Sequence, residues 1–167
     1  VLFRSWDLFQ GGKSLAVHFV HSWPDDAFKV STKKPVLRPG QWQHVFVTYN
    51  GSGKPGGIKM YVDGEEQVMK VEINTLKPGS SIRTSTPTRI GGRSGTQVFK
   101  GGSIQDARLY SRLVTAAEIK SIFGSGPLRA ILAVPAAKRT PQQRNALFDH
   151  YLITRDAKYQ ALDKSVA

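Results

Sequence analysis

Cysteine is absent from this chain of 167 residues, and acidic residues are scarce, with 12 Asp and Glu against 24 Lys and Arg. The first absence excludes disulfides, thiolate metal ligands and cysteine nucleophiles. The second leaves a net charge of +12, which favours attraction to polyanions. No apolar run reaches the length of about 20 residues that a helix needs to cross a bilayer, so we predict no membrane span.

The residue patterns of hydrolytic active sites are also missing. Glycoside hydrolysis uses two carboxylates on one surface, about 5 to 9.5 Å apart. Glu65 and Glu66 are adjacent, so they point to opposite faces of a strand, and Glu72 lies an odd number of residues from Glu65, which gives the wrong parity. No G-x-S-x-G motif is present to carry a serine nucleophile. The sequence therefore does not predict an enzyme.

The stretch from residue 40 to 66 predicts two paired strands. Apolar and polar residues alternate in WQHVFVTY, and we expect Trp42 to be in the core. A Gly-rich gap with Pro55 follows, and then Ile58, Met60 and Val62 alternate along IKMYV. The Asp-Gly pair after them predicts a type I′ turn. We therefore expect an antiparallel sheet at the centre of the fold.

Further strands are expected at residues 6–9, 15–23, 28–31 and 67–73, separated by loops rich in Gly and Pro. Residues 6–9 and 15–23 are expected to pair as a hairpin. No helix is predicted before residue 111. Short strands punctuated in this way are typical of a β-sandwich made of two sheets.

The pattern G-Q-W-x-H-V-x-V-T-Y, a Gly-rich gap and I-K-x-Y-V-D-G resembles the laminin-G-like, concanavalin A-like jelly-roll family. Residues 89–92 and 99–110 are similar to that family's closing strands, R-I-G-G and F-x-G-x-I-D-D-V-R-I-Y. The resemblance implies an all-β jelly-roll sandwich of two antiparallel sheets. It leaves function open, because the family includes lectins, adhesion modules and glycosidases.

The C-terminal part is predicted to be helical. A capping box at residues 115–118 begins a short closing helix that we expect to end at Gly124, with residues 124–127 (GSGP) as a linker. We therefore divide the chain into a jelly-roll domain, 1–126, and a helical extension, 127–167. Helices are expected to start at Thr140-Pro141 and at Asp156.

Two features concern the protein from which the chain derives. Residues from Leu132 to Tyr151 resemble the start of a helical domain of unknown function in large exported bacterial proteins that also carry c-type haem domains. The resemblance implies an exported protein whose haem c lies in other domains. Residues 1–5 (VLFRS) match the translation of a sequencing adapter, so we hypothesise that the natural protein begins at Trp6 here and that upstream strands are missing.

Carbohydrate binding needs an aromatic platform beside polar groups. Trp23 lies in a predicted loop with Asp25 and Asp26, His21 is nearby, and Arg93 in a Gly-rich turn can add a donor. We predict these five residues as the ligand site. The alternative is that Trp23 covers the end of the sandwich.

Calcium is the one cofactor left open, because some laminin-G-like domains bind it through aspartates, and Asp25, Asp26 and Asp106 are the candidates. The basic cluster at residues 33–38 lacks interleaved aromatic residues, which does not favour nucleic acid. We predict a non-catalytic module that binds polysaccharide or a neighbouring domain of the same protein. A structural insert without a ligand and a glycoside hydrolase are the alternatives.

Overall fold

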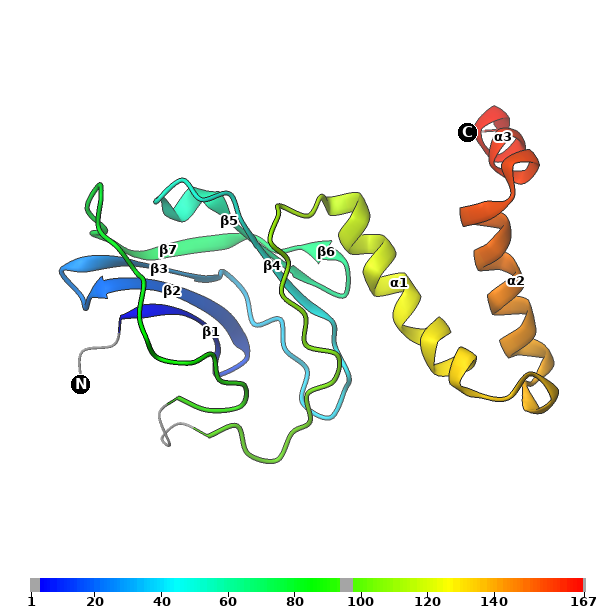
Figure 1. The fold of residues 1–167 in the computed structure, drawn as a ribbon, viewed down its shortest axis with the longest axis horizontal. Coiled ribbons are helices and arrows are strands. Elements are labelled where there is room, and N and C mark those ends of the chain that lie inside the picture. The colour runs from blue at the N-terminus through cyan, green and yellow to red at the C-terminus, as the bar shows by residue number, and fades with distance from the viewer. Residues whose placement is uncertain (1–3, 94–97, 167) are drawn as a thin grey trace. The chain divides into compact units, whose positions relative to one another are not determined.

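The computed structural model of the chain describes residues 4–93 and 98–166 (Figure 1). The strands are β1 (Ser5–Gly11), β2 (Ser14–Ser22), β3 (Asp26–Thr32), β4 (Val45–Tyr49), β5 (Ile58–Val62), β6 (Glu65–Glu66) and β7 (Met69–Asn74). The helices are α1 (Ala116–Ala133), α2 (Pro141–Arg155) and α3 (Ala157–Val166), with 3₁₀ turns η1 (Pro55–Gly57) and η2 (Ala136–Lys138).

The strands form two antiparallel sheets. One has four strands in the order β1-β2-β3-β7, and the other has three in the order β4-β5-β6. β1 and β2 form the expected hairpin, with Trp6 opposite Phe19. The turn between β5 and β6 has positive φ at both Asp63 and Gly64, which confirms the predicted type I′ geometry.

The hydrophobic core lies between the two sheets. Its buried members from the four-stranded sheet are Leu15, Val17, Phe19, Phe28 and Val30, and those from the three-stranded sheet are Ile58, Met60 and Val62. These residues recur at every second position of β2, β3 and β5, because alternate side chains of a strand share a face. The expected alternation in β2 and β5 is therefore confirmed.

The expected closing strands are not formed. Residues 89–92 and 99–110 run as irregular chain. Arg93, which follows the first range, makes an isolated bridge, and Phe99 N donates to Gly91 O at 2.8 Å. β1 and β7 each have one strand neighbour among the described residues, so this segment adds no strand to either edge of the four-stranded sheet. The prediction of two antiparallel sheets is confirmed, but that of two further strands in this region is wrong.

Trp42 is 68% exposed, so its prediction as a core residue is also wrong. β4 begins at Val45 because residues 38–43 form a loop held by the Gln43 side chain. Gln43 Oε1 accepts a hydrogen bond from Arg38 N at 2.5 Å, and Gln43 Nε2 donates to Val36 O at 3.1 Å. These bonds hold the chain in a loop before the alternating pattern enters the sheet.

The closing helix is longer than expected. α1 continues through residues 124–127 to Ala133, so the prediction of a helix end at Gly124 followed by a linker is wrong. Proline inside a helix removes one backbone hydrogen bond, and Pro127 does not end this one. By its internal contacts the chain divides into two compact units, Val1–Ala116 and Ala117–Ala167.

Within the second unit, α2 starts at the predicted Thr140-Pro141 pair. Thr140 Oγ1 accepts from Gln143 N, and the Gln143 side chain accepts from Thr140 N, which completes a capping box. Asp156 Oδ1 accepts from Tyr159 N at the start of α3, as expected. No helix among residues 4–93 and 98–166 is both long and apolar enough to cross a membrane.

Core packing predicts a large effect at Phe28, which is fully buried. We expect Phe28→Ala to lower the free energy of unfolding by about 3–5 kcal/mol, because it removes a large apolar side chain and leaves a cavity. The matched control is Leu109→Ala, at a residue that is 82% exposed, with an expected change within about 0.5 kcal/mol. Urea unfolding of both variants measures the difference, and equal losses would contradict the position of the core.

Candidate surface site on the four-stranded sheet

The face of the four-stranded sheet that points away from the core carries a row of polar side chains. Asp7 of β1 lies opposite His18 of β2, and His18 lies opposite Lys29 of β3. The strands therefore bring three residues that are 11 positions apart in sequence into one line across the sheet. We call this surface the outer face of the sheet.

His18 and Arg93 meet on the carboxylate of Asp7. His18 Nδ1 lies 3.0 Å from Asp7 Oδ1, and the Arg93 guanidinium contacts Asp7 Oδ2. The side chains of Asp7 and His18 are 18% and 12% exposed. Arg93, in the irregular segment after β7, is thereby held against the edge strand β1.

Aromatic rings surround the imidazole of His18. The Trp23 ring centroid lies 4.9 Å from that of His18, and the Phe9 ring lies 4.6 Å from it. Lys29 Nζ sits 5.7 Å from the centroid of the Phe9 ring. Trp23 remains 42% exposed. Trp23, His18, Asp7 and Arg93 form what we call the Trp23 cluster.

A second polar network continues the outer face to β7. The ladder between β3 and β7 shifts so that Glu72 is the extra residue of a β-bulge opposite Lys29 and Val30. Glu72 accepts from Ser31 Oγ at 2.5 Å and pairs with Lys29 Nζ at 2.6 Å. The hydrogen bonds from Lys29 and Ser31 lower the pKa of Glu72 to about 2, so it is ionised at neutral pH.

His18 is neutral at neutral pH. Burial, together with the Lys29 ammonium, lowers the pKa of its imidazole to about 4, against a smaller opposing effect of Glu72. The Nδ1 atom of the neutral imidazole lies beside Asp7 Oδ1, and its Nε2 is buried without a hydrogen-bond partner in the described part of the chain.

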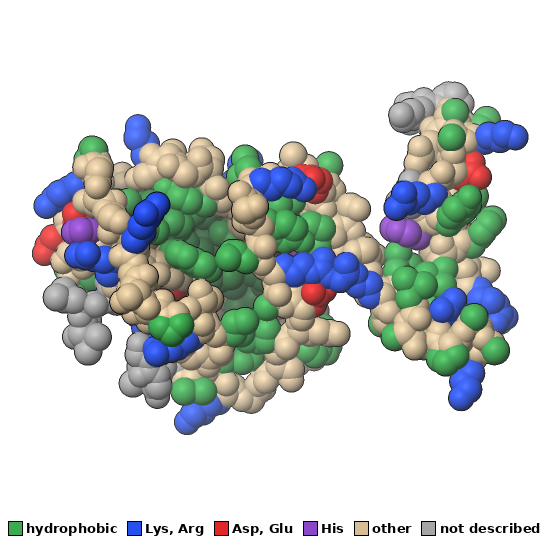
Figure 2. Space-filling view, viewed as in Figure 1, with side chains coloured by type: hydrophobic (Ala, Val, Ile, Leu, Met, Phe, Trp, Pro, Cys, Tyr) green, Lys and Arg blue, Asp and Glu red, His purple; other side chains and the backbone are tan. Residues whose placement is uncertain are grey.

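The five residues predicted as a ligand site are divided by the structure. Trp23 and Arg93 both belong to the Trp23 cluster. His21 and Asp26 instead hold the segment after β7: His21 Nδ1 is 2.7 Å from Ser81 O, and Asp26 accepts from Lys77 N and Ser80 Oγ at 2.9 and 2.6 Å. Asp25 is exposed in the turn that joins β2 to β3. Charged and histidine side chains gather at that end of the sheet, at the left of Figure 2.

The calcium candidates do not converge on one point. The Asp26 carboxylate is occupied by Lys77 and Ser80, and both Asp106 oxygens accept from the Arg108 guanidinium, at 2.7 and 2.5 Å. Hydrogen bonds lower the pKa of both aspartates, from Ser80 and Lys77 for Asp26 and from Arg108 for Asp106. In the described residues no three His, Asp, Glu or Cys side chains are placed to hold a metal ion. Asp26 and Asp106 are therefore each bound by protein donors at separate places in the described part of the chain.

Sequence analysis missed Asp7, His18, Lys29 and Glu72 as neighbours. A signal was present, because each is a polar residue within a strand otherwise rich in apolar residues. Once strands 6–9, 15–23 and 28–31 are paired as successive hairpins, residues 7, 18 and 29 fall in one row. The position of Glu72 depends on a bulge that alternation alone does not predict.

Comparison with protein-family models identifies the fold. Residues 4–120 match the Laminin_G_3 model, described as the concanavalin A-like lectin/glucanases superfamily. The chain belongs to this family. Laminin-G-like and concanavalin A-like descriptions thus apply to the unit that carries the Trp23 cluster.

The other comparisons add little. A crystal structure of an S-layer domain-containing protein (residues 221–444) from Clostridium thermocellum ATCC 27405 is similar at 19% identity and a TM-score of 0.38. The likeness covers 72% of this chain and 57% of the other, so this chain spans less than two thirds of that length. No curated protein sequence matches significantly.

The low pKa of His18 predicts a dependence of stability on pH. Between pH 6.5, where an unfolded histidine titrates, and about pH 4, only the unfolded chain takes up this proton, so acidification favours unfolding. We expect a loss of about 3 kcal/mol from this residue over that range. Urea unfolding across the range should show the loss in the native chain but not in His18→Gln. A His18 signal that titrates near pH 6.5 or above in NMR would contradict this assignment.

Because Asp26 and Asp106 already accept hydrogen bonds from the protein, we predict that calcium does not change the thermal stability of the chain. We expect the melting temperature of the chain to be the same with EDTA and with excess calcium, because Asp26 and Asp106 already bind protein donors. Differential scanning calorimetry measures it. A calcium-dependent rise that Asp26→Asn or Asp106→Asn removes would restore the calcium site.

Proposed function

We propose that the jelly-roll unit is a non-catalytic recognition module that binds carbohydrate at the Trp23 cluster. The observation that carries the proposal is the Trp23 ring, partly exposed and set 4.9 Å from His18 beside the Asp7–Arg93 ion pair. A sugar presents an apolar ring face and a rim of hydroxyl groups. An aromatic platform beside charged hydrogen-bonding groups suits both features.

The platform is held in place by its neighbours. The His18 ring lies next to the Asp7 carboxylate and contacts the rings of both Phe9 and Trp23, so the indole packs against a ring that is itself held by neighbours. A preorganised aromatic side chain loses little conformational entropy when it binds a ligand. Arg93 remains 34% exposed and, paired with Asp7, offers guanidinium donors to hydroxyl or carboxylate groups of a glycan.

The positions of the carboxylates support recognition rather than hydrolysis. Asp7 on β1 and Glu72 on β7 are separated by three inter-strand spacings, which amount to about 14 Å along the sheet. Glycosidases place their two carboxyl groups about 5 to 9.5 Å apart. Each of these carboxylates is, in addition, engaged by cations. A glycoside hydrolase therefore remains the less favoured reading of the family membership.

A second candidate is a structural or spacer module that docks on neighbouring domains. It is favoured by apolar side chains exposed on the jelly-roll unit, among them Trp42 at 68%, Ile90 at 65% and Leu109 at 82%. In either case we propose an exported multidomain protein, in which the helical unit begins a further domain. Any haem c belongs to other parts of that protein.

The test of carbohydrate binding compares two exposed tryptophans. We expect Trp23→Ala to weaken binding on a glycan array at least about fivefold, since stacking on an aromatic ring contributes about 1 kcal/mol or more. Trp42→Ala is the matched control, because it removes an exposed indole outside the cluster, and it should leave binding unchanged.

Salt separates recognition from simple charge attraction. Binding through Trp23 should persist at high salt, whereas attraction of a glycan to a chain of net charge +12 is screened. Binding that vanishes with salt and is equal in both variants would refute the carbohydrate site. A folded chain that binds no glycan would favour the spacer.

A further inference from the structure

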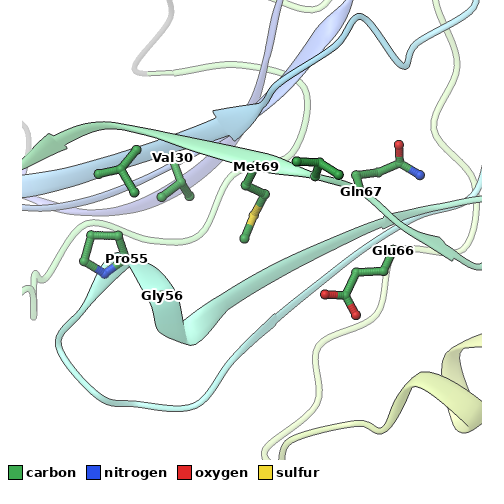
Figure 3. Close-up of a pocket in the computed structure, with 8 residues that line it drawn as sticks. Val30, Pro55, Gly56, Glu66, Gln67 and Met69 are labelled. Atoms are coloured by element: carbon green, nitrogen blue, oxygen red, sulfur yellow. The ribbon is translucent and has the colours of Figure 1, made fainter.

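β7 is an edge strand of the four-stranded sheet, and it borders an apolar groove of about 540 Å³. In Figure 3 the groove lies between Val30 and Met69 on one side and Pro55 and Gly56 on the other. Val71 also lines it and is 57% exposed. The strand thus offers an open backbone edge next to uncovered apolar side chains, a combination that favours pairing with another strand.

We propose that β7 pairs with β7 of a second copy of this chain, antiparallel, about a two-fold axis at Val71. The two four-stranded sheets then join into one continuous sheet across the dimer. Such an interface is isologous, since the same patch serves both copies. The occupant is inferred from the sequence of the strand, MKVEIN, which is complementary to itself in this arrangement.

The two β7 strands are complementary in charge, through Lys70 and Glu72, and in apolar character, through Val71. With Val71 opposite Val71 of the second copy, Lys70 lies opposite Glu72 of that copy, and the same pair recurs by symmetry. Opposite charges placed directly across an antiparallel ladder stabilise it. Glu72 already pairs with Lys29 at 2.6 Å, accepts from Ser31 at 2.5 Å and lies 3.5 Å from Lys70 of its own strand. A carboxylate has about four acceptor positions, so Glu72 can also accept the second copy's lysine.

Other registers lose this match. A shift by two positions places Lys70 opposite Lys70, or Glu72 opposite Glu72, and like charges across a ladder are destabilising. A shift by one turns the apolar groove of one copy towards the charged face of the other. In the chosen register both Val71 side chains lie on the groove side of the joined sheet, because Val71 pairs with the core residue Val30. In the dimer, each Val71 side chain therefore lies beside the groove of its own copy, at the edge where the two sheets join.

The other edge strand of this sheet does not have the property. β1 reads SWDLFQG and has one charged residue, Asp7, which already binds His18 and Arg93. Self-pairing of β1 therefore offers no pair of opposite charges. The joined edge centres on Val71, whereas Asp7 of the Trp23 cluster lies on β1, at the opposite edge of the four-stranded sheet.

The absence of cysteine makes a cross-linking test direct. Residues opposed across an antiparallel ladder have Cα atoms about 4.5–5.5 Å apart, within disulfide reach, whereas Lys70 and its own copy are diagonal, at about 7–8 Å. We therefore expect Val71→Cys in the full chain to form a covalent dimer with the thiol oxidant diamide, and the matched control Lys70→Cys to form little. Equal cross-linking of both variants, or none of Val71→Cys, would overturn the register.

Light scattering and sedimentation test the dimer without cysteine. The native chain should be dimeric at high concentration, Lys70→Glu should be monomeric, and the exchanged pair Lys70→Glu with Glu72→Lys should regain the dimer. Circular dichroism confirms that each variant is folded. A native chain that stays monomeric at all concentrations would overturn the proposal, as would a dimer that Lys70→Glu leaves intact.

Discussion

The aromatic contact between Phe19, Phe28 and Tyr49 is the interaction on which the jelly-roll unit depends. Phe19 and Phe28 stack at 4.8 Å between neighbouring strands of one sheet, and Tyr49 of the other sheet approaches Phe19 to 4.5 Å. Each phenylalanine is buried. Stacked and tilted rings add a geometric preference to the burial of their large apolar area. This contact fixes which face of the four-stranded sheet is inside.

Once that face is inside, the opposite face has to accommodate every alternate residue of the same strands. Asp7, His18 and Lys29 are polar residues that occupy those positions. Their charges do not stand alone on a partly buried surface, since Arg93 and Glu72 come from outside the hairpins to compensate them. The aromatic contact that turns one face of the sheet inward therefore also places His18, against which Trp23 packs, on the opposite face.

The sequence predicted the family, both sheets and the strand faces because these depend on local alternation and turns, as at Asp63-Gly64. It failed where tertiary contacts outweigh a local pattern. Trp42 belongs to an alternating run but is held in a loop by Gln43, and α1 passes through Pro127 although Gly and Pro usually mark a linker. Of the predicted ligand residues, Trp23 contacts His18, His18 contacts Asp7, and Asp7 contacts Arg93, which lies 86 positions after Asp7 in the sequence.

If carbohydrate binds at Trp23, the three tryptophans of the sequence allow the site to be tested in one spectrum. The indole N–H signals of Trp6, Trp23 and Trp42 can be followed by NMR while the array-selected oligosaccharide is added at high salt. The structure predicts that the Trp23 signal shifts in a saturable manner and that the Trp42 signal does not. A saturable shift of Trp42 with Trp23 unchanged would contradict the site.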